Sequence, residues 1–276
     1  MLKAYAFPLQ SYKRLQIKVY LCGMETVVLE HLTIGYTGKQ VASDLQAALQ
    51  AGEFTCLLGP NGVGKSTLLR TLSGFLRPLE GCVRLNGRDI LNLTPHERAG
   101  QIGVVLTTKL DAGHITVAEL VGMGRYPYTG FFGTLRNRDR RIVDEALALV
   151  GIEPLKTRLM GTLSDGERQK TMIAKALAQQ TPVIFLDEPT AFLDFPSKVE
   201  TMQLLRRLAH ELHKTILLST HDIEQALQVS DRLWLMDSGA LHVGSPRQLA
   251  ADGSLSRFIQ RGNIRFDADN LRVFIT

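Results

Sequence analysis

One run of nine residues limits the possible folds of this chain more than any other: Gly59-Pro60-Asn61-Gly62-Val63-Gly64-Lys65-Ser66-Thr67. It matches the pattern G-x-x-x-x-G-K-[ST], which binds phosphate where it joins a strand to a helix. Residues 54–58 before it are typical of a short buried strand, and residues 67–72 after it are typical of the first turns of a helix. We therefore predict a strand, a phosphate loop and a helix in that order.

The chemistry expected of this loop follows from its residue types. Glycines allow the backbone to bend so that successive N–H groups point at phosphate oxygens, and the following helix adds the positive end of its dipole. Lys65 is expected to reach the β- and γ-phosphates, and the Ser66 hydroxyl to bind a Mg²⁺ that bridges them. A glycine-rich turn that carries a lysine by chance is the alternative, and the flanking strand and helix disfavour it.

Composition excludes several classes of protein. With 276 residues, 45% of them hydrophobic and 21% charged, the chain can bury a core and is neither disordered nor fibrous. The net charge of +5 suits a nucleotide, a nucleic acid or an anionic membrane surface without choosing among them. Three cysteines without C-x-x-C spacing predict neither a disulfide framework nor a zinc site, and indicate a reducing compartment. No run approaches the ~20 apolar residues that span a bilayer.

Acidic and histidine side chains follow two further strands of the predicted sheet. Residues 182–186 form an apolar run that ends in Asp187 and Glu188, and residues 215–220 form another that ends in His221. Runs of this kind are typical of parallel strands covered on both faces. Because ligands of open parallel sheets bind at the carboxyl ends of strands, we expect the phosphate loop, the two acids and the histidine to converge on one nucleotide.

The rest of the chain divides around this predicted sheet. Residues 1–23 show no clear period and are expected to be an N-terminal extension of a folded domain over residues 24–253. Residues 90–170 look mostly helical, and residues 254–276 are expected to form a tail with a β-hairpin. Tyr36 lies on a strand ahead of the loop, where it is either a core residue or, as the phosphate loop favours, a stacking partner for a purine base.

Taken together, these motifs resemble those of the ATP-binding subunits of ABC transporters, over about residues 25–253. Residues 163–169, Leu-Ser-Asp-Gly-Glu-Arg-Gln, resemble the LSGGQ signature, with Asp165 and Glu167 in place of two usual residues. The other matches are residues 59–66 to Walker A, residues 183–188 to Walker B and its glutamate, residues 191–194 to the D-loop, His221 to the switch histidine, and Tyr36 to the base-stacking aromatic.

The resemblance implies an α/β fold of the P-loop NTPase class and ABC type, with a mostly parallel core sheet, an antiparallel N-terminal β part and an inserted helical subdomain. It also implies that Asp187 holds Mg²⁺ through water, that Glu188 polarises the attacking water and that His221 bonds the γ-phosphate. The implied site has as catalytic residues Glu188 and His221, as metal-binding residues Ser66, Thr107 and Asp187, and as ATP-binding residues Tyr36, Gly59, Pro60, Asn61, Gly62, Val63, Gly64, Lys65, Ser66, Thr67, Ser164, Asp165, Gly166, Glu167 and Asp194.

Thr107 departs from the family pattern. A glutamine that touches Mg²⁺ and the attacking water should follow the strand at residues 102–106, yet no glutamine occurs between Gln101 and Arg168. Threonine is shorter by about two heavy atoms, and Mg²⁺ takes its oxygens at ~2.0–2.1 Å. We therefore expect a water to fill the gap, a weakly held metal and slow basal hydrolysis.

Partners and cargo also follow from the resemblance. It implies a head-to-tail homodimer, in which Ser164 and Gly166 of one copy face the ATP held by Lys65 of the other, and a permease dimer at the cytoplasmic face of the cell membrane. The Gly-Arg-Tyr-Pro stretch at residues 124–127 resembles importers of iron-siderophore complexes, haem and cobalamin. The expected function is ATP hydrolysis that powers import of such a metal chelate, which an external substrate-binding protein and the permease select. Nucleic acid is not an expected partner.

Two other functions share part of these motifs. A soluble ATPase of DNA repair or chromosome maintenance would insert a very long coiled coil, for which residues 90–170 are too short. A regulatory module that holds ATP without hydrolysing it would not need both Glu188 and His221.

Overall fold

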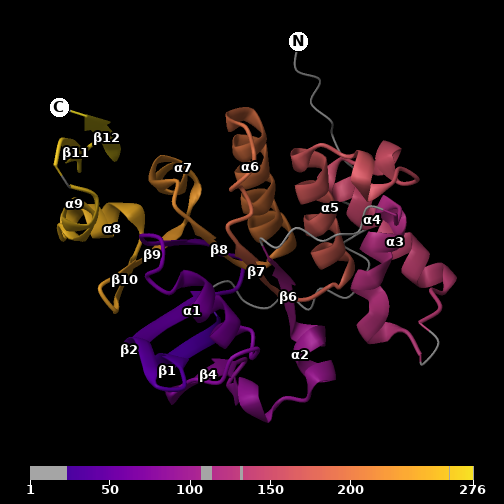
Figure 1. The fold of residues 1–276 in the computed structure, drawn as a ribbon, viewed down its shortest axis with the longest axis horizontal. Coiled ribbons are helices and arrows are strands. Elements are labelled where there is room, and N and C mark those ends of the chain that lie inside the picture. The colour runs from indigo at the N-terminus through magenta and orange to yellow at the C-terminus, as the bar shows by residue number, and fades with distance from the viewer. Residues whose placement is uncertain (1–23, 107–113, 131–132, 261, 276) are drawn as a thin grey trace.

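The computed structural model describes residues 24–106, 114–130, 133–260 and 262–275. Its centre is a six-stranded sheet with the strand order β10-β9-β3-β8-β7-β6 (Figure 1). Five of these strands are parallel, and β10 pairs antiparallel with β9 at one edge. The strands are β3 (Phe54–Leu58), β6 (Ile102–Val105), β7 (Val183–Asp187), β8 (Thr215–Thr220), β9 (Arg232–Asp237) and β10 (Ala240–Gly244).

A second, antiparallel sheet is built mainly from the N-terminal residues. Its strand order is β2-β1-β4-β5, and the long strands β1 and β2 form its main hairpin. Its strands are β1 (Glu25–Tyr36), β2 (Lys39–Gln50), β4 (Glu80–Leu85) and β5 (Arg88–Asp89). The predicted mostly parallel core sheet and antiparallel N-terminal part are therefore both present.

Three helices lie beside the parallel strands. They are α1 (Lys65–Leu72) after β3, α6 (Phe195–Leu212) between β7 and β8, and α7 (Ile223–Val229) after β8. The 3-10 turn η2 (Ile90–Asn92) and the short helix α2 (Pro95–Gln101) lead into β6. Thr94 and Pro95 begin α2 with a capping box: the Thr94 hydroxyl accepts a hydrogen bond from the N–H of Glu97, whose carboxylate in turn accepts one from the N–H of Thr94.

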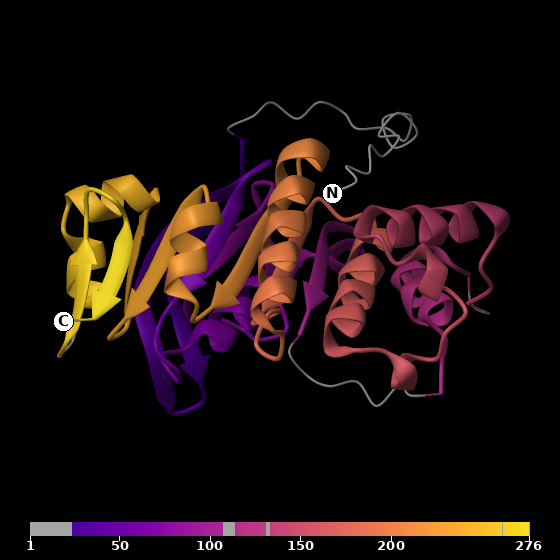
Figure 2. The same cartoon turned by 90° about the horizontal axis from the view of Figure 1, so that it is seen from above.

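The described chain between β6 and β7 is helical, and we call residues 114–178 the helical part. Figure 2 shows it at one end of the molecule, with the C-terminal tail at the other. The helical part contains α3 (Val117–Gly122), η3 (Met123–Tyr128), α4 (Asn137–Val150), η4 (Glu153–Leu155), η5 (Met160–Thr162) and α5 (Asp165–Ala178). Helix α8 (Pro246–Ala251) follows β10, and the tail contains α9 (Ser254–Ile259) and a hairpin of β11 (Ile264–Asp267) and β12 (Arg272–Ile275). Within the described residues, every helix is too short or too polar to cross a bilayer.

Alternate residues of the parallel strands contribute to two apolar clusters, one on each face of the six-stranded sheet. Phe54, Cys56 and Leu58 join what we call the helical-face cluster, which includes buried residues of α3 to α6 and of the tail. Leu57 and Phe185 join the sheet-face cluster, which includes buried residues of α1 and of the antiparallel sheet. This alternation matches the two-residue period of a strand and explains why these strands are apolar throughout.

Candidate nucleotide-binding site

The glycine-rich loop leaves the carboxyl end of β3, a strand at the centre of the sheet between β9 and β8. Two of its glycines lie where a side chain has no room. A Cβ on Gly59 would lie 2.7 Å from the Met236 carbonyl oxygen, and one on Gly64 would lie 2.4 Å from Val41 Cγ1. Gly64 also has φ 116° and directly precedes the first residue of α1, Lys65. The backbone shape of the loop therefore requires glycine at both positions.

Lys65 is held inside the loop that it follows. Its side chain is only 5% exposed, and its Nζ donates hydrogen bonds to the carbonyl oxygens of Gly59 (2.8 Å) and Pro60 (3.2 Å). The same Nζ lies 3.6 Å from Glu188 Oε1. The ammonium thus occupies the concave side of the loop, where phosphate oxygens can replace the two carbonyls as its partners. Asn61 and Gly62 are exposed at the tip of the loop, while Thr67 is buried.

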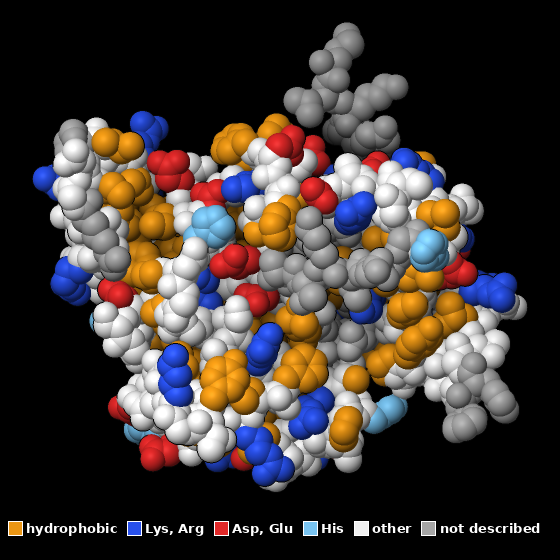
Figure 3. Space-filling model, in the orientation of Figure 1, with side chains coloured by type: hydrophobic (Ala, Val, Ile, Leu, Met, Phe, Trp, Pro, Cys, Tyr) orange, Lys and Arg blue, Asp and Glu red, His pale blue; other side chains and the backbone are white. Residues whose placement is uncertain are grey.

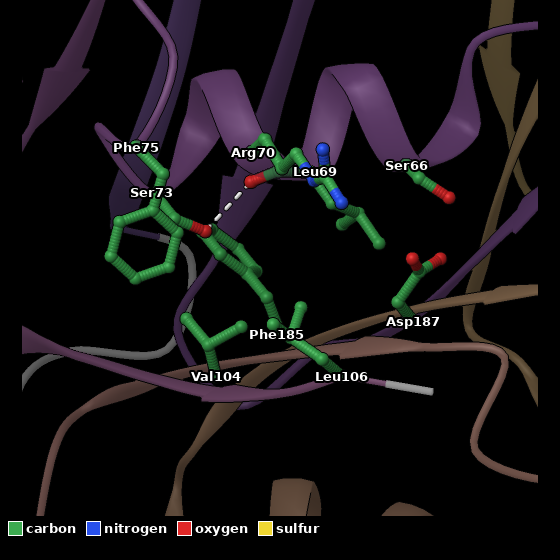
Figure 4. Close-up of a pocket in the computed structure, with 9 residues that line it drawn as sticks. All are labelled: Ser66, Leu69, Arg70, Ser73, Phe75, Val104, Leu106, Phe185 and Asp187. Atoms are coloured by element: carbon green, nitrogen blue, oxygen red, sulfur yellow. Dashed lines mark hydrogen bonds between the residues drawn. The ribbon is translucent and has the colours of Figure 1, made fainter. Parts of the chain in front are cut away.

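Ser66 and Asp187 approach each other across the pocket drawn in Figure 4. About 230 Å³ of space, part of it open solvent, lies between the side chains that line this pocket, and they leave no room for a water-sized sphere. Its opposite wall is apolar, formed by Phe75, Val104 and Phe185 among others, and the Ser66 hydroxyl and the Asp187 carboxylate point toward one another at the polar end. A hydroxyl and a carboxylate that face each other beside a phosphate loop are oxygen ligands of the kind that Mg²⁺ prefers, so the residues present fit this ion.

Glu188 has an unusual backbone conformation next to Asp187. Its φ is 45°, in the left-handed region that non-glycine residues seldom adopt. Its N–H donates to Ser219 Oγ at 2.9 Å, and Ser219 Oγ in turn donates to Asp187 Oδ1 at 2.7 Å. The Glu188 carboxylate then lies between Lys65 and His221, whose Nδ1 is 4.0 Å from Glu188 Oε2. Lys65, Asp187, Glu188 and His221 are therefore together, as the strand-end argument predicted.

The residues at the start of α5 form a capping box. Ser164 Oγ accepts a hydrogen bond from the Glu167 N–H, and Glu167 Oε2 accepts one from the Ser164 N–H at 2.8 Å. This bond from the Ser164 backbone holds the pKa of Glu167 below its ordinary value. The departure from LSGGQ at Glu167 therefore has a structural use, because the glutamate stabilises the start of the helix. Helix α5 packs in the helical-face cluster, whereas α1, which follows the phosphate loop, packs in the sheet-face cluster, so the two helices lie on opposite faces of the six-stranded sheet.

Asp194 and Tyr36 complete the predicted site residues that the structure describes. Asp194 caps α6 by accepting a hydrogen bond from the Ser197 N–H at 3.1 Å, and hydrogen bonding to Ser197 lowers its pKa. Tyr36 ends β1 and is 45% exposed, so its ring is available to a base. Basic side chains gather over α1 and the antiparallel sheet on the face seen in Figure 3, which gives this region a positive potential suited to phosphates.

Comparison with known proteins identifies the family. Residues 42–191, more than half of the chain, match the profile of the ABC transporter family. The chain belongs to this family. An uncharacterized ABC transporter ATP-binding protein of Methanocaldococcus jannaschii, MJ0873, is 44% identical over 207 residues, which cover 75% of this chain and 71% of that protein. The ferric enterobactin transport ATP-binding protein FepC of Escherichia coli is 38% identical over 229 residues, 83% of this chain and 84% of FepC.

Solved structures agree with this ABC assignment. An inward-facing putative metal-chelate type ABC transporter matches with a TM-score of 0.74 and 28% identity, over 85% of this chain and 88% of that one. The dimeric cassette MJ0796, bound to ADP and phosphate after hydrolysis, matches with a TM-score of 0.69 and 28% identity, over 79% of this chain and 98% of that one. The predicted family, fold class and ATPase activity are confirmed: this ABC protein is an ATP-hydrolysing transporter subunit that binds adenine nucleotide.

Thr107 lies outside the described residues. The last described residue before it, Leu106, is partly exposed and lines the pocket beside Asp187. The water-mediated metal contact expected of Thr107 therefore stays a prediction.

The sequence patterns alone do not identify the roles of two residues of this ABC protein. Ser219 lies inside the apolar run at residues 215–220, where a serine is itself a signal that a buried hydroxyl has a partner. Arg125, in the stretch that pointed to metal-chelate importers, is only 3% exposed. It packs inside the helical part, where its Nε donates to Asp139 Oδ1 at 3.1 Å.

Proposed function

We propose that this chain hydrolyses ATP to power the import of a metal chelate, such as an iron-siderophore complex or cobalamin, through a membrane permease. The observation that carries the proposal is the meeting of Lys65, Asp187 and Glu188 at the carboxyl ends of β3 and β7, the parallel strands on either side of β8. The class of cargo is supported by the likeness to FepC and to the metal-chelate type transporter.

The geometry supports a distinct role for each side chain. Lys65 exchanges the carbonyl oxygens of Gly59 and Pro60 for β- and γ-phosphate oxygens when ATP enters. Glu188 orients the attacking water and takes its proton, and His221, on the other side of that carboxylate, donates a hydrogen bond to the γ-phosphate. A Mg²⁺ held by Ser66 and, through water, by Asp187 would neutralise charge on the phosphates. Tyr36 stacks on the adenine.

The proposed assembly is a head-to-tail homodimer bound to a permease dimer at the cytoplasmic face of the membrane. The capped start of α5 offers backbone N–H groups and the positive end of a helix dipole, yet α5 lies on the opposite face of the sheet from α1, the helix that follows the phosphate loop of its own chain. A second copy supplies the nucleotide that Ser164 and Gly166 would contact. The dimeric cassette MJ0796 provides a precedent for such a pair. An external substrate-binding protein acts indirectly by delivering the chelate to the permease.

Two substitutions test the assigned chemistry. Lys65→Ala removes the buried point charge of the loop, so we expect tight ATP binding to be lost. Glu188→Gln keeps the shape of the site but removes the general base, so we expect retained ATP binding, a trapped dimer and hydrolysis slower by ~10²–10⁴-fold. The measurements are equilibrium ATP binding, phosphate release and mass in solution.

Glu211→Gln provides the matched control, because Glu211 is an exposed glutamate near the end of α6. It should hydrolyse ATP at the parent rate. Hydrolysis at the parent rate by Glu188→Gln would show that the role assigned to Glu188 is wrong.

The cargo is tested with the permease complex. We expect ATP hydrolysis by the complex in vesicles to rise when a binding protein loaded with its metal chelate is added. Stimulation by a sugar- or amino-acid-loaded binding protein instead would reject the metal-chelate assignment while leaving the ATPase assignment intact.

A further inference from the structure

Ser219 joins the two acidic residues of the site through one hydroxyl group. The Ser219 side chain is fully buried, at 0% exposure, on β8. Its Oγ donates to the carboxylate of Asp187 (2.7 Å to Oδ1) and accepts from the backbone N–H of Glu188 (2.9 Å). The single proton and one lone pair of this hydroxyl are therefore used by two consecutive residues of the neighbouring strand end.

The register of the sheet brings Ser219 to this point. Ser219 pairs with Asp187 of β7 on one side and with Leu57 of β3 on the other. Paired residues of neighbouring parallel strands point to the same face of the sheet. On that face Ser219 therefore lies between Leu57, an apolar core residue, and Asp187. A buried hydroxyl in that row is unfavourable unless it is hydrogen-bonded, and both of its bonds go to the acidic pair.

The two bonds constrain different parts of the acids. The bond to Oδ1 fixes the rotation of the Asp187 carboxylate, which Figure 4 shows turned toward Ser66. The bond from the Glu188 N–H supports a residue whose φ is 45°, a conformation that needs help from its surroundings. Asp187 and Glu188 are adjacent in the chain. Their carboxylates can therefore point to different parts of the site only if the backbone between them keeps a fixed conformation.

We propose that Ser219 is a positioning residue for ATP hydrolysis, whose hydroxyl sets the relative orientation of the metal-holding acid and the general base. This inference rests on the proposed function of Asp187 and Glu188. Ser219 is fully buried, so its effect on the nucleotide passes through the two acids. It acts by keeping the Asp187 carboxylate directed at Ser66 and the Glu188 carboxylate between Lys65 and His221.

Two substitutions of Ser219 test this role in the full chain. Ser219→Ala removes both hydrogen bonds, and Ser219→Cys keeps a side chain of similar shape that donates only weakly. For both we expect kcat at saturating Mg²⁺ and ATP to fall by ~10- to 100-fold, the range found when groups that orient metal ligands are removed. The alanine variant should show the larger loss.

Nucleotide binding provides a second readout that needs no hydrolysis. The affinity for the non-hydrolysable analogue AMP-PNP is measured by titration calorimetry with Mg²⁺ and again with EDTA. The Ser219 variants should keep the parent affinity in EDTA within about twofold, since Lys65 and the loop are untouched, and lose most of the extra affinity that Mg²⁺ provides.

Thr215→Val is the matched control at the other end of the same strand. The Thr215 hydroxyl is buried and lies 2.9 Å from the Thr26 hydroxyl, far along β8 from the acids. This variant loses a buried hydrogen bond of the same kind, so its melting temperature should fall while its kcat and its Mg²⁺ response stay at parent values.

The outcomes separate this inference from the proposed function. A parent chain without Mg²⁺-dependent hydrolysis rejects the proposed function, whereas the Mg²⁺ response of AMP-PNP binding still tests Ser219. Ser219 variants with the kcat and Mg²⁺ response of the parent would overturn the inference. So would variants that lose affinity equally in Mg²⁺ and in EDTA, because that result indicates a packing defect only.

Discussion

At the scale of single residues, the folded structure disfavours the charged form of Lys214. It directly precedes β8, at the opposite end of that strand from Ser219, and its Nζ donates to the Thr181 carbonyl oxygen. Burial lowers the pKa of Lys214 from the ordinary 10.5 to about 8. The unfolded chain therefore holds this proton more tightly than the folded one, and the charged form of Lys214 reduces stability.

The free energy of unfolding should therefore depend on pH through Lys214. Below pH 8 Lys214 is charged in both states and the full penalty applies, and between pH 8 and 10.5 the folded state loses the proton first, so the penalty shrinks. The free energy of unfolding of the parent minus that of Lys214→Met should therefore rise from pH 7 to pH 10.5, by up to ~3 kcal/mol. Urea titrations at several pH values measure this difference, and a constant difference would contradict it.

The site residues differ in how far the sequence could predict them. The phosphate loop was predictable because its shape depends on local glycines, and Asp187 and Glu188 because they directly end an apolar strand. Ser219 was not, since its role depends on the register between β7 and β8, which no local pattern encodes. The left-handed backbone of Glu188 was equally out of reach, because a glutamate carries no propensity for it.

At the scale of elements, Arg125 ties η3 to two helices. Its Nη1 donates to the Ala178 carbonyl (2.8 Å) at the end of α5 and to Gln180 Oε1 (3.0 Å), and its Nε bonds to Asp139 in the first turn of α4. The guanidinium also lies 4.1 Å from the centre of the Tyr128 ring. The arginine of the Gly-Arg-Tyr-Pro stretch is thus an internal clamp of the helical part.

Removal of this clamp should destabilise the chain strongly. Arg125→Ala leaves Asp139 as a buried carboxylate without its guanidinium, so we expect a loss of ~3–5 kcal/mol in the free energy of unfolding. Arg138→Ala, at an exposed arginine of the same helix as Asp139, should change stability by less than about 0.5 kcal/mol. Chemical denaturation measures both, and equal effects of the two substitutions would show that the buried pair contributes little.

Element boundaries show where sequence patterns lose information. The sequence indicates a crossover helix over residues 199–212, but α6 begins at Phe195, because Asp194 caps it and Pro196 occupies its first turn. The strand β2 was not predicted at all, since alanines, glutamines and a lysine favour a helix there. These residues form a strand because they pair with β1 along its whole length. Such tertiary pairing is not encoded in local propensity.

At the scale of the whole molecule, the tail packs on the core that the helices share. Phe266 of β11 is 7% exposed within the helical-face cluster, and Val273 of β12 packs against the same cluster. By contrast, residues 1–23 lie outside the described residues and lack a core-facing period in sequence. The two ends of the chain are therefore expected to respond differently to truncation.

Deletion of residues 1–23 should leave the melting temperature unchanged, whereas deletion of residues 262–276 should cost about 2–3 kcal/mol of stability through lost burial of Phe266 and its neighbours. Scanning calorimetry of the two truncated chains beside the parent makes the comparison. A drop of several degrees on removal of residues 1–23 would mean that this segment packs on the domain.

The helical-face cluster has a consequence for how the chain unfolds. The same set of touching side chains includes Val117 and Leu147 of the helical part, Leu58 and Leu218 of the sheet, and Leu255 of the tail. Although Figure 2 shows three regions side by side, this one apolar cluster runs through all of them. We therefore expect the regions to unfold in one cooperative transition. The unfolding enthalpy measured by calorimetry should then equal the van't Hoff enthalpy calculated from the steepness of the melting curve, as it does for a two-state domain.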